Sequence, residues 1–185
     1  MEILEFFQTI KVPATVAHVI GVVFGMGGAL VSDILFSFFS KDKKLNKTEL
    51  ATLSILSKTV LYSLIFIALS GLALFLGDIE KYLSSAKFLA KMSILLALLI
   101  NGFVLNKYIW PHLLNRNFFT LKKERNIRRL AFVCGAISVV SWLSVCGLGI
   151  LETLDMSYGL IISVYLAIIL FSAIVALAVE RKEFN

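Results

Sequence analysis

Residues 14–36 read ATVAHVIGVVFGMGGALVSDILF, an apolar stretch interrupted by few polar side chains. A helix of this length rises about 34 Å, which is enough to cross a bilayer hydrocarbon core of about 30 Å. The stretch therefore predicts a transmembrane helix. Ionisable side chains are costly inside such a helix and are functional candidates by default, and here they are His18 and Asp33.

The composition of the whole chain indicates the same class. Of the 185 residues, 59% are hydrophobic and only 16% are charged, which is more apolar surface than a soluble domain of this size can bury. The apolar runs are long and continuous, which excludes a β-barrel. We predict an all-α polytopic transmembrane helical bundle, a single integral membrane domain over residues 1–185. The expected spans are 14–36, 50–76, 86–108, 129–150 and 158–179.

Two local signals refine this prediction near the N-terminus. Residues 1–12 carry apolar side chains among charged ones, which is typical of a short interfacial helix, and we expect it to end at Pro13. Asn46 followed by Glu49 resembles a capping box that opens the second span.

The basic residues of the loops predict the orientation. Thirteen of the 18 Lys and Arg residues lie on one side of the predicted bundle, and three lie on the other side. By the positive-inside rule, we expect the N-terminus outside and the C-terminus in the cytoplasm, with the chain in the cell (inner) membrane. The basic loop NRNFFTLKKERNIRRL, residues 115–130, is expected to lie against anionic lipid headgroups. The net charge of +6 is therefore no sign of nucleic-acid binding.

Counting residues from the ends of the spans places the intramembrane polar side chains in two layers. His18 and Lys91 each lie about five residues inside a span that starts outside, so we expect both near the outer leaflet. Asp33, Lys58 and Asn101 fall in the inner half. An ion pair between Asp33 and Lys58 is the simpler interpretation of the inner layer, and a proton or ion path is the alternative.

The outer layer has a chemical interpretation and a structural one. Histidine titrates near neutrality and ligates metals, while lysine can hold an anionic group. His18, Gly21, Gly25, Gly28 and Ser32 share one stripe of a helix. The small residues could leave room beside His18 for a flat ligand, or they could serve close helix packing.

Two segments carry a resemblance to known families. HVIGVV at residues 18–23, followed by a glycine-rich apolar run, resembles the first helix of the HemJ family of membrane protoporphyrinogen oxidases. KFLAKMSILLALL at residues 87–99 resembles the third helix of that family. The two positions thought essential in the family fall on His18 and Lys91. The continuation LINGFVLNKYIWP, residues 99–111, also resembles the CopD copper-resistance membrane family. Both families share a four-helix core, which would cover the first four spans and leave the fifth as an addition.

The resemblance implies haem b or a related tetrapyrrole as cofactor and a protoporphyrinogen oxidase-like activity. His18 would be the metal ligand, Gly21 and Gly25 would line the cofactor, and Lys91 would be catalytic or would pair with a carboxylate. The other histidine, His112, lies about 31 Å deeper than Lys91 by helical rise, so a bis-histidine haem within one chain is disfavoured. Met92 or no residue would lie opposite His18.

We therefore expect a haem- or tetrapyrrole-associated membrane redox protein. A CopD-like copper or ion transport protein is one alternative, in which Asp33, Lys58 and Asn101 line a path. A structural subunit of a larger membrane complex is another, in which the polar residues only hold helices together. The expected partners are membrane lipids, a tetrapyrrole or copper, and a second copy of the chain or a larger complex.

Overall fold

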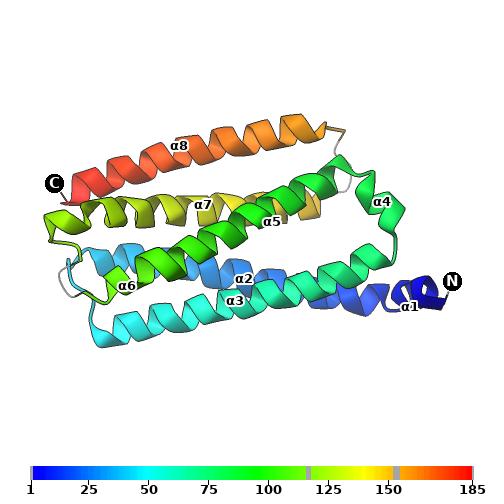
Figure 1. The fold of residues 1–185 in the computed structure, drawn as a ribbon, viewed down its shortest axis with the longest axis horizontal. Coiled ribbons are helices and arrows are strands. Elements are labelled where there is room, and N and C mark those ends of the chain that lie inside the picture. Colours follow the sequence, from blue (N-terminus) through cyan, green and yellow to red (C-terminus); the bar gives the residue numbers. More distant parts are fainter. Residues whose placement is uncertain (1, 116–117, 152–154, 185) are drawn as a thin grey trace.

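The computed structural model describes residues 2–115, 118–151 and 155–184, and these form helices joined by short loops (Figure 1). The helices are α1 Glu2–Thr9, α2 Lys11–Ser40, α3 Lys47–Leu76, α4 Ile79–Leu83, α5 Ala86–Val104, the π-helical turn η1 Leu105–Ile109, α6 Trp110–Leu113, the short 3-10 turn η2 Lys122–Glu124, α7 Arg125–Ile150 and α8 Tyr158–Phe184.

Within the described residues, five helical segments are long and apolar enough to cross a membrane. They are Lys11–Ser40, Lys47–Leu76, Ala86–Leu113, Lys122–Ile150 and Tyr158–Phe184. The chain is therefore an all-α bundle of multi-pass type, as the sequence predicts. The segments run up and down in chain order, so the described N-terminal and C-terminal ends lie at opposite ends of the bundle (Figure 1). The bulky apolar side chains on its outer faces, among them Phe24, Phe66 and Phe171, are exposed, as expected of a surface that faces lipid.

The bundle is organised around two helix pairs, α2 with α3 and α5 with α7. α2 and α3 pack along most of their length, and α7 packs against α2, α5 and α8. α8 lies on the side of α5 and α7, away from α2 and α3 (Figure 1). A buried cluster of Ala29, Ile67, Leu98 and Trp142 joins the two pairs at the centre.

The start of α3 agrees with its sequence-based prediction, whereas the end of α1 does not. Asn46 caps α3: its side chain accepts a hydrogen bond from the Glu49 backbone at 2.9 Å, and the Glu49 carboxylate accepts one from the Asn46 backbone at 2.8 Å. The predicted capping box is confirmed. The short N-terminal helix, however, ends at Thr9 rather than at Pro13. Pro13 lies in the first turn of α2, where its missing N–H costs no hydrogen bond.

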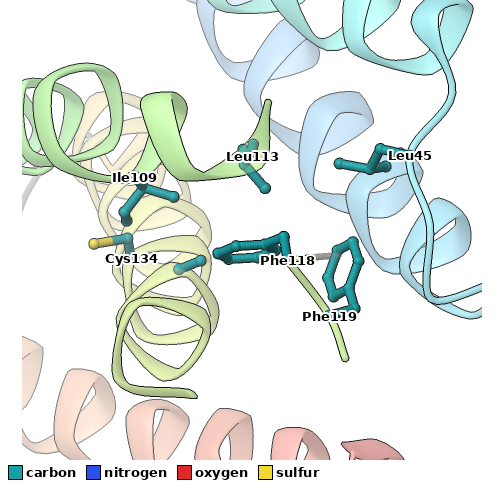
Figure 2. Close-up of a cluster of buried hydrophobic side chains, with 7 residues drawn as sticks. Leu45, Ile109, Leu113, Phe118, Phe119 and Cys134 are labelled. Carbon is teal, nitrogen blue, oxygen red and sulfur yellow. The ribbon is translucent and has the colours of Figure 1, made fainter. Parts of the chain in front are cut away.

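Two phenylalanines between α6 and α7 are buried in the protein. Phe118 and Phe119 are only 1% and 3% exposed and pack with Leu45, Leu113 and Cys134 (Figure 2). Their aromatic rings close the end of the bundle that carries the α2–α3 loop. The expectation that residues 115–130 lie against lipid headgroups is therefore wrong for Phe118 and Phe119, whereas Lys122, Lys123 and Arg125 are exposed. Residues 116–117 of this loop lie outside the described part of the chain.

A buried ion network fastens α8 to α7 at the same end. Arg128 donates from Nε to Oε1 of Glu180 at 2.7 Å and from a terminal nitrogen to the carbonyl of Phe119 at 2.9 Å. Arg129 donates to the other oxygen of Glu180 at 3.3 Å. The guanidinium of Arg128 also lies 4.8 Å from the centre of the Phe184 ring. Arg128, predicted to be a loop charge, is thus a buried residue that links two helices and a loop.

Glu180→Ala should destabilise the bundle, because it leaves Arg128 buried without its carboxylate. Removing one partner of a buried pair costs about 3–5 kcal/mol. The thermal unfolding midpoint of the detergent-purified protein measures the effect. Glu80→Ala, at an exposed position of α4, is the matched control and should leave the midpoint unchanged. Equal midpoints for the two variants would contradict a stabilising role for the network.

Candidate functional site

His18 lies on α2, half-buried against α3. Its Nδ1 is 3.2 Å from Oγ of Ser70, a buried residue on α3. Ser70 gives its own hydroxyl proton to the carbonyl of Phe66, 2.7 Å away. The serine oxygen is thus an acceptor toward the ring, so the hydrogen-bond network assigns the proton of neutral His18 to Nδ1. Nε2 then carries the free lone pair.

Gly71 provides the space that the ring occupies. A Cβ at this position would lie 3.3 Å from Cε1 and 3.5 Å from Nδ1 of His18, so the imidazole lies directly against the backbone of α3. Ser70 and Gly71 therefore act together: one orients the ring by a hydrogen bond and the other allows the close approach. This pair could not be predicted from the sequence, because Ser70–Gly71 is one of several small dipeptides in the spans.

Lys91 lies on α5, half-buried, and approaches the same region from the other side. Its Nζ is 4.0 Å from the position that a Cβ on Gly149 of α7 would take, and the side chain lies within electrostatic range of His18. In the part of the chain that the structure describes, no hydrogen bond or ion pair is recorded for Lys91, whereas nearby Lys87 donates to the carbonyl of Leu151. The predicted outer layer of His18 and Lys91 is thus brought together.

The glycine stripe below His18 is filled by protein. A Cβ on Gly21 would lie 2.8 Å from Ile67, and one on Gly25 would lie 2.6 Å from the ring of Trp142. Gly28 is in similar contact with Val60. These contacts favour the packing interpretation of the stripe, because Gly21 and Gly25 let α3 and Trp142 approach α2 closely. That the two glycines line a cofactor stays a prediction.

The inner layer differs from its expected arrangement. Asp33 faces α7, where its Oδ1 lies 3.3 Å from the position of a Cβ on Gly135. Lys58 is exposed, and the described residues show no ion pair between it and Asp33. The predicted ion pair is therefore wrong. The two side chains share a depth, but they do not point toward each other.

Asn101 has a structural role. Its side chain, 5% exposed, donates to the carbonyl of Cys134 at 3.0 Å and so ties α5 to α7.

Asn106, one turn further along, faces α3 instead. It accepts a hydrogen bond from Ser57 at 3.2 Å and donates to the carbonyl of Gly102 at 3.0 Å. Asn106 belongs to the π-helical turn η1, an irregularity that often accompanies functional sites in helices.

A cavity of about 100 Å³ lies beside Asp33, between α2, α3, η1, α6 and α7. Its polar lining comes from Ser32, Asp33, Ser57, Asn106 and Trp110, and the remainder is apolar. Sequence reasoning identified Asp33 but missed Ser57 and Trp110 as its neighbours. Tertiary packing determines which face of α3, and which part of residues 105–113, meets α2. No local sequence motif predicts this packing.

The two histidines lie far apart. His112 is on α6, near the end of the bundle that carries the α2–α3 loop, and its Nδ1 is 2.7 Å from Oε2 of Glu124, whose side chain is 7% exposed. His18 lies toward the other end. Among the described residues, no group of three or more His, Cys, Asp and Glu side chains is close enough to hold a metal ion. His18 is thus a single nitrogen donor.

Comparison of the chain with family models, with curated proteins and with solved structures finds no match.

Gly25→Ala should destabilise the protein, because the new methyl group meets the rigid ring of Trp142. Overpacking of this kind costs about 1–3 kcal/mol. A shorter ring should relieve it, so the double variant Gly25→Ala/Trp142→Phe should lose less than the sum of the single variants. Thermal unfolding in detergent measures all of these.

Gly27→Ala provides the matched control on the same helix, since a Cβ there meets nothing within 4 Å. It should be neutral or gain up to about 1 kcal/mol of helix propensity. If Gly25→Ala behaves like Gly27→Ala, the stripe is not a packing surface.

Proposed function

We propose that the protein is a membrane redox protein that holds haem or a related tetrapyrrole through Nε2 of His18. One arrangement carries the proposal: Nδ1 of His18 lies 3.2 Å from Oγ of Ser70, and because the Ser70 hydroxyl donates to the carbonyl of Phe66, we infer that Nδ1 is the donor and that Nε2 keeps a lone pair for a metal. Metal-ligating histidines characteristically donate their second ring nitrogen in this way, which fixes both the tautomer and the ring orientation. The absence of a family match leaves the proposal resting on this geometry and on the resemblance of the two segments.

The donor set fits a tetrapyrrole with one protein ligand. His112 is too distant to be a second ligand, and Met92 follows Lys91 by one residue, so it points about 100° away from it around α5 and is 43% exposed. A single imidazole does not form the histidine or methionine cluster that a copper site requires, which disfavours the copper alternative.

Lys91 supplies the charge that such a site needs. Tetrapyrroles carry carboxylates, and an ammonium group that has no partner among the described residues and lies in a low-dielectric region would pair with one of them. A bound haem would supply electron transfer, while the chain supplies orientation through His18 and charge through Lys91. Ser70 is a positioning residue, because it acts through the ring of His18.

An absorption spectrum of the detergent-purified protein from haem-replete cells tests the proposal. We expect a Soret band that His18→Ala abolishes. Ser70→Ala should keep the fold and lower haem affinity about 10–100-fold, since it removes the group that orients the ligand. Lys91→Met should also weaken retention.

His112→Ala is the matched control, because it removes the other histidine at the opposite end of the bundle and should leave the Soret band intact. Colourless protein that is nevertheless folded and monodisperse would overturn the proposal, as would a band that survives His18→Ala.

We also propose that the chain lies in the cell membrane, the inner one where there are two, with its N-terminus outside and its C-terminus in the cytoplasm. The α2–α3 loop, α6, the start of α7 and the described C-terminal end of α8 lie at one end of the bundle (Figure 1), and these segments carry most of the described basic residues. A green fluorescent protein fused after Phe184 should fluoresce, and alkaline phosphatase fused there should be inactive. The opposite pair of results would invert the orientation.

A further inference from the structure

Asp33 is a carboxylate without a counter-charge inside the membrane-spanning part of the bundle. Its Oδ2 is inaccessible to solvent and has no hydrogen-bond partner in the structure. An isolated anion in low dielectric costs several kcal/mol. A carboxylate in this position is therefore stabilised by whatever positive charge reaches it.

The surrounding protein supplies no such charge. Of the residues that line the cavity beside it, Asp33 is the one with an ionisable side chain. On α3, Lys58 is exposed and turned away. On α7, Cys134 is within electrostatic range of Asp33 but carries no positive charge, and Arg128 is held by Glu180.

The cations of the neighbouring η1 and α6 segments are also occupied. Lys107 lies 5.2 Å from the ring centre of Phe103, and His112 is paired with Glu124. Every described cation that could approach Asp33 from a packed element is thus engaged elsewhere or exposed.

The cavity suits a small, hard ligand. A volume of about 100 Å³ admits a few water molecules or a partly hydrated ion, and it is too small for a tetrapyrrole. Its polar lining residues include oxygen-bearing side chains: the Asp33 carboxylate, the hydroxyls of Ser32 and Ser57, and the amide of Asn106. Hard cations prefer oxygen ligands, and a single carboxylate charge matches a single positive charge.

We propose that Asp33 and this cavity form a binding site for one monovalent cation, either a proton or an alkali-metal ion. The site is independent of the His18 region, which lies toward the opposite end of α2. Ser57 and Asn106 hold their side chains toward the cavity through their mutual hydrogen bond, and Asp33 provides the charge. Nothing in the proposal requires a bound tetrapyrrole.

Trp110 lines the cavity and serves as the reporter. The chain has two tryptophans, so Trp142→Phe makes Trp110 the sole one. In lipid nanodiscs, its fluorescence is recorded while pH is varied without alkali-metal ions, and then while sodium replaces choline at fixed pH and ionic strength. We expect a saturable change in one or both titrations, and Asp33→Asn should abolish it.

The two titrations separate the ligands. A change with pH alone assigns the site to a proton, and a change with sodium assigns it to an alkali-metal ion. A pH response that Asp33→Asn does not reduce does not arise from this site. Ser57→Ala should weaken binding without removing the charge, which keeps the test valid if Asp33→Asn fails to fold.

Glu183→Gln is the matched control. Glu183 also has a buried carboxylate oxygen without a partner, but it lines a different cavity beside Ser40 and Lys41. It should leave the Trp110 response unchanged. Fluorescence that is insensitive to both pH and sodium, or a response that Asp33→Asn leaves unchanged, would overturn the proposal. His18→Ala should preserve the response, so this site and the proposed haem site fail or succeed separately.

Discussion

The close contact between α2 and α3 determines where the polar side chains of α2 point. In lipid, helices gain little from burying apolar surface against each other, so association depends on tight packing of small residues. Gly21, Gly25 and Gly28 place one stripe of α2 against α3 and Trp142. At the N-terminal end of the stripe, this contact places the His18 ring within hydrogen-bond distance of Ser70. Asp33 directly follows Ser32, the last residue of the stripe, and is therefore rotated about 100° around the helix from it, so that it faces α7.

Features that depend on local sequence could be predicted well. The five spans follow from the length and continuity of the apolar runs, and the start of α3 follows from the reciprocal side-chain pattern of Asn46 and Glu49. That His18 and Lys91 lie within electrostatic range of each other follows from counting along helices of known rise. These properties need no knowledge of which helix faces which, because the bilayer fixes the direction of every span.

Features that depend on helix rotation could not be predicted. Asp33 and Lys58 share a depth, which suggested an ion pair, but depth leaves the rotation of α3 about its axis undetermined. That rotation turns Lys58 outward and Ser57 toward the cavity. The burial of Phe118 in a basic loop could not be predicted either, because it depends on which distant residues the loop packs against. The adjacent Phe118 and Phe119 favour burial, but the basic residues around them favour a location against lipid headgroups.

Other buried polar groups show what a membrane bundle requires of a polar side chain, and among the described residues Asp33 and Glu183 each keep one buried carboxylate oxygen outside that pattern. Ser141 donates to the carbonyl of Ile137 and bonds to Tyr165, and Arg128 is matched by Glu180. Each of these groups locks one helix to another or satisfies itself within its own turn, which is what a bilayer demands of polar atoms. Asp33 does neither, although Gly135 leaves room for its carboxylate. A lock requires a partner in the protein, so a buried charge that has room but no partner is better explained by a ligand that comes and goes.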